Sequence, residues 1–334
     1  MSVQVNKFRS YLSELSSIIS VKHWLQHLQD PSSIQPFLRE FSTSIEDIHR
    51  DWSTTPAKSF SLAAFEPLLK RPFVRLNKDQ IIAPLPSLIC NALGEGFYHG
   101  LLDMYDKTDR DKLARCFGVF LEEYVRRVFR SAYLNIPHCC VLGDEAYGKR
   151  NSKRATDVVV FEGDDVIFIE VVARRVNLGA ILDFNESSIE EVFYNGIERK
   201  LKQLHLNIES YIAGELYPKR TRPSHQRIFA MIATSVPYPT VYAVNEYIPE
   251  IVASNDWLHN VESIEMISVD DIELLEDSMP RGFRLADFLI SRKSEPDKRP
   301  LNNSLLANPR IGNGRPSLLR GNAFIQKIAE ELHS

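Results

Sequence analysis

Two acidic residues, Asp157 and Glu170, stand in neighbouring apolar segments and are the strongest candidates for chemistry. The segments Thr156–Phe161 (TDVVVF) and Val166–Val172 (VIFIEVV) are typical of two strands joined by a tight turn. With that turn at residues 162–165, Asp157 lies opposite Glu170, where cross-strand Cβ atoms are about 4.5–5.5 Å apart. Like charges at this distance need a compensating cation. Mg²⁺ prefers oxygen ligands and suits two carboxylates.

A plainer interpretation is that one face of this hairpin is exposed and both acids point into water. This alternative stays open, because antiparallel strands often have one solvated face. The acidic turn residues Glu162, Asp164 and Asp165 are given no functional role, since acidic residues are common in turns.

A long amphipathic segment before the hairpin offers a third carboxylate. Its apolar residues recur with a helical period: Leu113, Phe117, Phe120, Leu121, Tyr124, Val125, Val128, Phe129 and Ala132. Glu122 and Glu123 flank this stripe, and the helical wheel alone does not choose between them. Gly118 lies one turn before Glu122 and would let another backbone or a ligand approach that face.

The string FGVFLEEYV, then Asp157 at the head of an apolar strand and IEVV in the next strand, resembles the PD-(D/E)XK nuclease superfamily over roughly residues 111–290. The resemblance implies an α/β fold with a restriction-endonuclease-like core, a central mixed sheet flanked by helices. By position it implies that Glu122 is the helix acid and that Asp157 and Glu170 bind Mg²⁺ or Mn²⁺. The backbone carbonyl of Val171 would be a further ligand.

The same resemblance implies a metal-dependent nuclease that hydrolyses phosphodiester bonds, with DNA as the expected substrate. Defence against foreign DNA, antiviral defence included, is one setting that the superfamily suggests.

One position departs from the superfamily pattern, because Val172 stands where a lysine is expected. That lysine is thought to orient the attacking water and to offset charge in the transition state. Arg174, and Lys200 or Lys202 on the following helix, are candidate substitutes. An arginine stabilises phosphate charge but stays protonated. Without a substitute, the alternative is a catalytically inactive module that binds nucleic acid or a protein partner.

Basic residues surround the acidic pair in sequence. They are Lys149, Arg150, Lys153 and Arg154 before Asp157, and Arg175 after Glu170. Lysine and arginine contacts to phosphates give affinity that does not depend on base sequence. We therefore expect a nucleic-acid track here, with a solvated basic loop as the alternative; Lys153 and Arg154 are also possible replacements for the missing cation.

The overall charge narrows the classes of partner. With 40 Lys plus Arg and 44 Asp plus Glu, the net charge of −4 excludes a globally basic nucleic-acid binder but not a local basic face. The 4 cysteines form no Cys-x-x-Cys pair and no long apolar run occurs. We expect a cytoplasmic protein without a membrane segment.

Three regions are expected along the chain. Residues 1–110 are expected to form a mostly helical accessory domain that offers a surface for a protein partner or a homodimer. Ile18 and Ile19 lie on its helical period, and a strand or a hairpin is expected at Glu66–Ile82. Residues 111–290 hold the nuclease-like domain. Residues 291–334, rich in Pro, Asn and Gly, are expected to be a basic, largely irregular tail.

Overall fold

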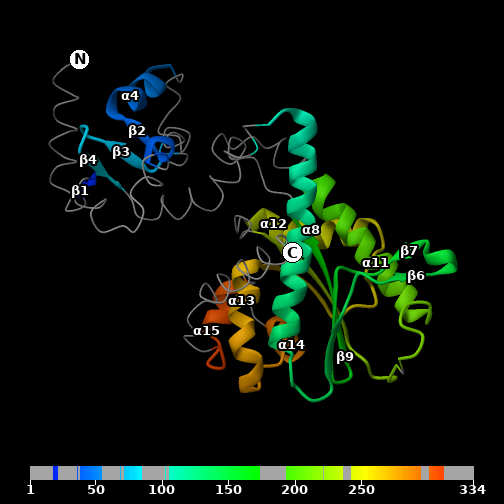
Figure 1. Ribbon diagram of the computed structural model, residues 1–334. Coiled ribbons are helices and arrows are strands. Elements are labelled where there is room, and N and C mark those ends of the chain that lie inside the picture. Colours follow the sequence, from blue (N-terminus) through cyan, green and yellow to red (C-terminus); the bar gives the residue numbers. More distant parts are fainter. Residues whose placement is uncertain are drawn as a thin grey trace, which may run out of the picture. The chain divides into compact units, whose positions relative to one another are not determined.

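The computed structural model describes residues 18–21, 36, 38–54, 68, 71–84, 102, 105–173, 193–220, 222–235, 242–294 and 301–311. The chain forms two compact units (Figure 1). The N-terminal unit comprises Met1–Leu113 with Asn177–Glu186, and the C-terminal unit comprises Ala114–Val176 with Ser187–Ser334.

The C-terminal unit is built on a mixed five-stranded sheet in the order β11-β10-β9-β8-β5. The strands are β5 (Cys139–Leu142), β8 (Val158–Glu162), β9 (Asp165–Val172), β10 (Ile228–Thr234) and β11 (Ser263–Ser268). Strands β9, β10 and β11 are parallel, whereas β8 is antiparallel to both β9 and β5. The α/β class expected from the sequence is thereby confirmed.

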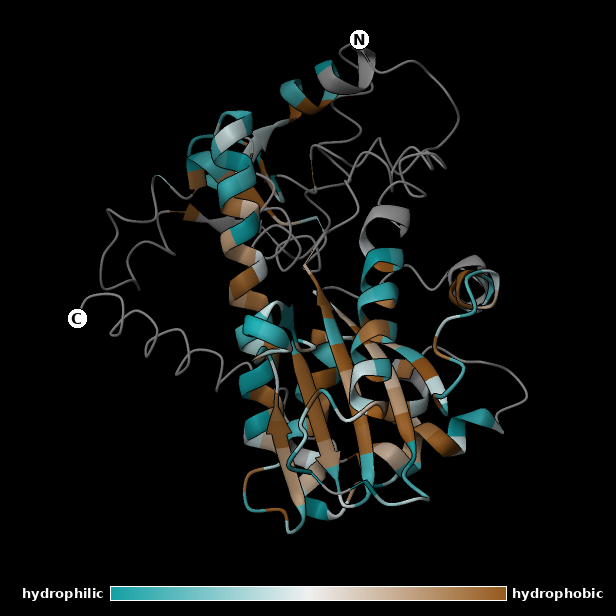
Figure 2. Cartoon of the chain, turned by 90° about the vertical axis from the view of Figure 1, so that its right-hand side faces the viewer, coloured by the Kyte–Doolittle hydropathy of each residue, from teal (hydrophilic) through white to brown (hydrophobic). Residues whose placement is uncertain are grey.

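The β8–β9 hairpin has the expected register, with Val158 opposite Ile169 and Phe161 opposite Val166. Every residue of both strands is buried. Figure 2 shows the strands of this sheet as largely hydrophobic along their length. Gly163 makes the turn with a φ of 66°, a conformation that favours glycine.

Helices cover both faces of the sheet. Apolar residues of α8, α13, α14 and α15 share one core with Ile169 and the alternate residues of β8, β9 and β10. Helix α11 covers the other face (Figure 1). Its Tyr211 packs on Phe161 and Phe168. The bounds are α8 (Lys107–Ala132), α11 (Arg199–Ile212), α12 (Tyr242–Ser254), α13 (Val269–Ser278), α14 (Leu285–Lys293) and α15 (Leu301–Ala307). A π-helical turn, η4 (Phe193–Glu198), precedes α11.

The amphipathic segment before the hairpin is helix α8, as expected. It buries Leu121, Val125, Val128, Phe129 and Ala132, which repeat at intervals of three and four residues. Phe120 departs from the expected stripe, because its position on the wheel leaves it 40% exposed.

The N-terminal unit contains more strand than its helical pattern predicts. Strands β1 (Ile18–Ser20), β2 (Ser42–Ser44), β3 (Phe73–Arg75) and β4 (Gln80–Ile82) form a sheet in the order β1-β4-β3-β2, beside helix α4 (Ile45–Thr54). The β3–β4 hairpin lies within the segment predicted to be one. The helical prediction for Ile18 and Ile19 is wrong, because both residues lie in β1 and pair with Ile82 and Ile81 of β4. β-Branched residues such as isoleucine are enriched in strands.

Part of the segment expected to be an irregular tail is helical. Helix α14 continues to Lys293, and α15 follows in the Asn-rich segment. The main core includes Leu301, Leu305 and Ile311. Their burial there explains why the segment folds although its apolar residues are widely spaced. Arg292 is buried there and pairs with Glu265 at 3.1 Å.

No helix among the described residues combines the length and the apolar character needed to cross a membrane.

Candidate active site

The two acids singled out from the sequence meet at one end of the β8–β9 hairpin. Asp157 immediately precedes β8 and Glu170 lies in β9. The hairpin register puts both side chains on the face that α11 covers. Asp157 is 7% exposed and Glu170 is 0% exposed. The interpretation that both acids point into water is therefore wrong.

Lys200, near the start of α11, joins the two acids. Its Nζ lies 2.9 Å from Oδ2 of Asp157 and 2.6 Å from Oε2 of Glu170. The side chain of Lys200 is only 11% exposed, so these contacts are partly shielded from water. Val172 lies two residues after Glu170 and shares its side of the strand. The ammonium group of Lys200 therefore comes from α11 to the same face of the strand to which a lysine at position 172 would point.

The charges of this triad perturb one another. Burial raises the pKa of Glu170 well above its ordinary value, and the Asp157 carboxylate adds to this effect, while Lys200 opposes it. Burial alone would lower the pKa of Lys200, but the carboxylates of Glu170 and Asp157 outweigh it and raise that pKa to about 12. Lys200 therefore carries its positive charge at neutral pH.

One buried carboxylate oxygen of the pair has no hydrogen-bond partner among the described residues. The backbone N–H of Val171 donates to Oδ2 of Asp157 at 2.8 Å, and the same oxygen accepts from Lys200. Oε1 of Glu170 is buried and has no hydrogen-bond partner in the described part of the chain. An unpaired buried polar oxygen is costly. A ligand or a proton would relieve that cost.

Glu122, and not its neighbour Glu123, lies close enough to Asp157 for the two carboxylates to interact. Burial raises the pKa of Glu122, and the Asp157 carboxylate raises it further while Lys200 opposes the shift. Glu123 instead accepts hydrogen bonds from Arg126 and Arg127 on its own helix, each at 2.7 Å. The structure thus resolves a choice that the helical wheel leaves open. The position of α8 against the sheet decides which of the two glutamates lies near Asp157.

Two contacts fix α8 beside this end of the hairpin. A Cβ added to Gly118 would lie 3.7 Å from that of Ala173, the residue that follows β9. Arg126 donates from Nε to the backbone carbonyl of Asp157 at 3.1 Å. The close approach expected at Gly118 is therefore made by the end of β9. The Arg126 contact therefore holds α8, and with it Glu122, next to Asp157.

The oxygen donors here fit a hard divalent cation. Among the described residues no group of three or more His, Cys, Asp or Glu side chains is arranged to hold a metal ion. The buried acids nevertheless share a single lysine, and Oε1 of Glu170 lacks a partner. Two carboxylates with a free oxygen are the ligand type that Mg²⁺ and Mn²⁺ prefer. Asp157 and Glu170 could hold such an ion, with Glu122 close by.

Other candidate residues lie elsewhere. Lys202 is exposed on α11, whereas Lys200 two residues before it is buried. Arg174 and Arg175 lie outside the described residues. The structure therefore gives no position for the arginine predicted to replace the missing lysine.

The basic loop before Asp157 is itself a small hairpin, which the sequence did not predict. It consists of β6 (Ala146–Tyr147), η3 (Lys149–Asn151) and β7 (Lys153–Arg154). Its four basic side chains divide into two pairs. Lys153 pairs with Glu215 and Arg154 with Asp144, each at 2.8 Å.

Lys149 and Arg150, at the tip of that hairpin, are exposed and form no ion pair with the described part of the chain. The hairpin is held against α11, the helix that carries Lys200. The Tyr147 hydroxyl lies 2.8 Å from the side-chain amide of buried Asn207. Two free cations are thus presented by a hairpin attached to the same helix as the site lysine.

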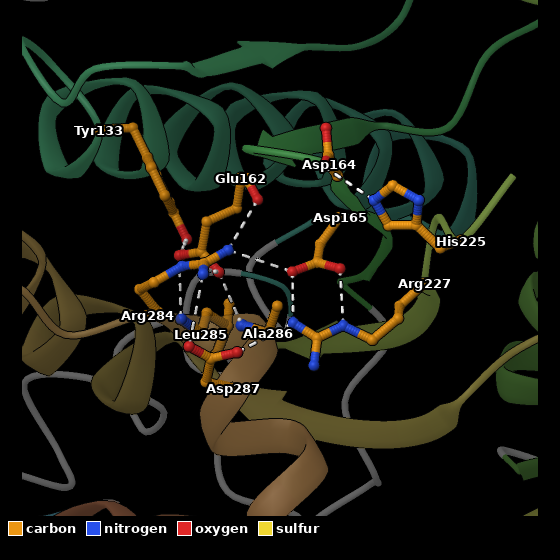
Figure 3. Close-up of polar contacts among 10 residues, drawn as sticks. All are labelled: Tyr133, Glu162, Asp164, Asp165, His225, Arg227, Arg284, Leu285, Ala286 and Asp287. Carbon is orange, nitrogen blue, oxygen red and sulfur yellow. Dashed lines mark hydrogen bonds and ion pairs between the residues drawn. The ribbon is translucent and has the colours of Figure 1, made fainter. Parts of the chain in front are cut away.

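A second group of buried charges lies at the opposite end of the β8–β9 hairpin (Figure 3). Glu162 is 2% exposed and accepts hydrogen bonds from the Tyr133 hydroxyl at 3.0 Å and from the backbone N–H groups of Leu285 and Ala286 at 3.0 and 2.8 Å. The Glu162 carboxylate thereby satisfies donors at the beginning of α14. Arg284 also donates to the backbone carbonyl of Glu162 at 3.0 Å.

Asp165, on the other side of the turn, is held by two arginines. Arg227 makes two hydrogen bonds to it, at 2.7 and 2.6 Å, and Arg284 makes a third at 3.1 Å. Arg227 also reaches Asp287 at 2.9 Å (Figure 3). Of the three acidic turn residues only Asp164 is exposed, and its carboxylate lies near His225. Local sequence could not reveal this connection, because its arginines are 62 and 119 positions from Asp165.

No model of a known protein family matches this sequence, and a search of curated proteins finds no significant relative.

Proposed function

We propose that the C-terminal unit is a metal-dependent nuclease domain with a restriction-endonuclease-like core. The mixed five-stranded sheet supports this, with its buried hairpin followed by helix α11 and the parallel strand β10. Mg²⁺ is the proposed cofactor and Mn²⁺ its substitute. DNA is the expected substrate, and defence against foreign DNA is a fitting setting.

The observation that carries the proposal is the contact of one buried lysine with both acids. Asp157 and Glu170 would hold the metal ion, with Glu122 nearby and the carbonyl of Val171 as a further oxygen donor. When bound, the ion would supply an activated water and stabilise the departing oxygen.

Lys200 is the proposed replacement for the cation absent at Val172. Since its pKa is about 12, it stays protonated and cannot take up a proton at neutral pH. Its role is to donate hydrogen bonds to a phosphate oxygen or to orient a water molecule beside the acids. Arg174 remains a candidate for the same role. The exposed cations Lys149 and Arg150 would contact phosphates of the strand, together with Arg175.

A second candidate function follows from the same lysine contact. With Lys200 bonded to both carboxylates, the triad is also what a purely structural buried ion cluster would require. The unit would then bind nucleic acid, or a protein partner, without cleaving a substrate.

A cleavage assay with Asp157→Asn distinguishes the two functions. The full chain is incubated with plasmid DNA, single-stranded DNA and RNA in the presence of Mn²⁺. We expect wild type to release products and Asp157→Asn to release none. The matched control is Asp164→Asn, an exposed acid at the other end of the hairpin, which should cleave like wild type. If wild type binds a strand in a salt-sensitive manner but cleaves no substrate, the nuclease proposal fails.

Metal binding provides an independent readout. Mn²⁺ should raise the Tm of wild type, because a ligand that binds only the folded state stabilises it. The Asp157→Asn variant should lose most of this shift, while Asp164→Asn should keep it. An equal response in wild type and Asp157→Asn would overturn the assignment of the metal site.

A further inference from the structure

The N-terminal unit contains a cavity of about 380 Å³ whose chemistry is unlike that of the acidic site. Its described lining comes from the β3–β4 hairpin, β2, the chain before β2 and the residue after β1. The lining residues are Val21, Pro36, Leu38, Arg39, Ser42, Arg75, Lys78 and Ile81. This volume falls within the usual range of small-molecule sites, about 300–1,000 Å³.

Three cations line this cavity. Arg39, Arg75 and Lys78 are exposed side chains, and no acidic residue is among the described lining residues. None of the three forms an ion pair with the described part of the chain. Three positive charges that no described residue compensates, gathered at one cavity, attract an anion of more than one negative charge.

Arg75 is held in place without losing its charge. One of its guanidinium nitrogens donates to the Ser42 hydroxyl oxygen at 2.6 Å, and that hydroxyl donates in turn to the Leu38 carbonyl. Ser42 is buried, so this anchor is protected from water. The other guanidinium N–H groups remain available for two hydrogen bonds to one planar or tetrahedral anion.

Lys78 lies in a turn that its neighbours fix. Asn77 accepts a hydrogen bond from the backbone of Asp79 at 2.9 Å and donates to the side chain of Gln80 at 2.7 Å. The backbone of Val21 donates to the Asp79 carbonyl at 2.9 Å. The turn that carries one cation is therefore tied to the apolar wall of the same cavity.

The inner wall of the cavity is apolar. Leu38 and Ile81 are 6% and 2% exposed and belong to one hydrophobic cluster, against which Val21 packs. An inorganic anion would use the cations alone and leave this wall unused. A ligand that carries both a ring and a charged group would use both parts.

We propose that this cavity binds a phosphate monoester that carries a ring of nucleotide size. A phosphate monoester has a charge of about −1.5 to −2 near neutral pH, which matches three cations better than a single carboxylate does. The ligand is a free nucleotide or the 5′-phosphorylated end of a strand, because both present the same chemistry. All the described lining residues belong to the N-terminal unit, and the proposed binding does not depend on the proposed cleavage.

Calorimetric titration of the full chain tests the proposal, with EDTA present so that no metal-dependent reaction occurs. The probes are adenosine monophosphate, adenosine, inorganic phosphate and a 5′-phosphorylated trinucleotide. We expect the monophosphate to bind at least about tenfold more tightly than adenosine or inorganic phosphate. Tighter binding of the trinucleotide identifies the strand end as the ligand, and weaker binding identifies the free nucleotide.

Charge removal provides the control. Arg39→Gln and Lys78→Gln should each weaken monophosphate binding about tenfold or more, because each removes a charged donor. Both side chains are exposed, so the variants should keep the wild-type Tm. Arg71→Gln removes an exposed cation of the same unit that does not line the cavity, and should bind like wild type. Equal binding of adenosine and its monophosphate, no binding at millimolar concentration, or an equal loss in Arg71→Gln would overturn the proposal.

Discussion

The two ends of the β8–β9 hairpin both bury acidic residues beside cations, but they satisfy them to different degrees. At the turn, Glu162 accepts three hydrogen bonds through its carboxylate and Asp165 accepts three from two arginines. At the open end, Asp157 and Glu170 share one lysine, and Oε1 of Glu170 has no partner among the described residues.

The pKa values follow this difference. Burial raises the pKa of Glu162, and the N–H groups of Ala286 and Leu285 and the Tyr133 hydroxyl limit the rise. Burial raises the pKa of Glu170 well above its ordinary value, since the Asp157 carboxylate adds to the effect. Hydrogen bonds from the fold itself hold the carboxylate of Glu162, whereas the under-satisfied carboxylate of Glu170 retains the capacity to bind a ligand.

The largest expected difference between the two ends of the hairpin is the effect of a substitution on the cleavage rate. Glu170→Gln keeps the size of the side chain but removes the negative charge, so we expect the rate of phosphodiester cleavage to fall by about 10²-fold or more. Glu162→Gln, at the turn, should leave the rate per folded molecule unchanged. The measurement is single-turnover cleavage with Mn²⁺, with circular dichroism to count folded protein. Equal losses at both ends would mean that neither glutamate acts locally.

Two lysines on α11 sharpen the comparison. Lys200→Met removes the ammonium that contacts both acids, and cleavage should fall by about 10²-fold or more. Lys202→Met removes an exposed charge two residues away and should change the rate less than about twofold. Tm values in EDTA establish that both variants fold. A normal rate in Lys200→Met would exclude Lys200 as the replacement for the missing cation.

Substitutions at the turn end of the hairpin should change the stability of the fold and not the cleavage rate. Glu162→Ala leaves two backbone N–H groups and one hydroxyl without their acceptor in a buried position, so the free energy of unfolding should fall by about 3 kcal/mol. Urea denaturation measures this change. Asp164→Ala, an exposed neighbour in the same turn, should stay within about 0.5 kcal/mol of wild type. A loss below 1 kcal/mol for Glu162→Ala would show, by the same scale, that these donors find other partners.

Tyr133→Phe should have a smaller effect at the same place. It removes the hydroxyl that donates to Glu162 at 3.0 Å but leaves the two backbone donors, so we expect a loss of about 1 kcal/mol in urea denaturation. The double variant with Glu162→Ala should lose less than the sum of the two single variants, because the residues share one contact. Strict additivity would contradict the contact.

The smallest effect concerns the pH dependence of two adjacent glutamates. The pKa of Glu122 is raised above 4.5, first by burial and then by the Asp157 carboxylate. That of Glu123 is lowered, because the arginine contacts, that of Arg127 foremost, outweigh burial. Glu122 thus destabilises the fold as pH rises from 4.5 through its raised pKa. Glu123 stabilises the fold above pH 4.5 and loses this effect as pH falls through its lowered pKa.

Urea denaturation in EDTA from pH 3 to pH 8 checks the two signs. Glu122→Gln should be more stable than wild type at neutral pH, and Glu123→Gln should be less stable. Both differences should shrink towards the acid end. Shifts of the same sign would contradict the different placement of the two carboxylates.

Sequence patterns predicted several elements correctly. The hairpin register followed from the place of a two-residue turn between two apolar runs, and α8 followed from its helical period. These signals are local and repeat over many residues. The prediction of helix at Ile18 and Ile19 failed because pairing with β4 overrides a weak local period. Helix α15 was missed because Leu301 and Leu305 become informative only against the core that they join.

The sequence by itself determined that Asp157 and Glu170 stand opposite each other, because side chains alternate strictly along paired strands. It named Lys200 only as one of several possible cations. Tertiary structure alone decided that Lys200 reaches both acids, that Glu122 and not Glu123 interacts with Asp157, and that Glu162 and Asp165 are buried. Those outcomes depend on how helices dock on the sheet. Docking joins residues far apart in the chain, whose proximity no local spacing encodes.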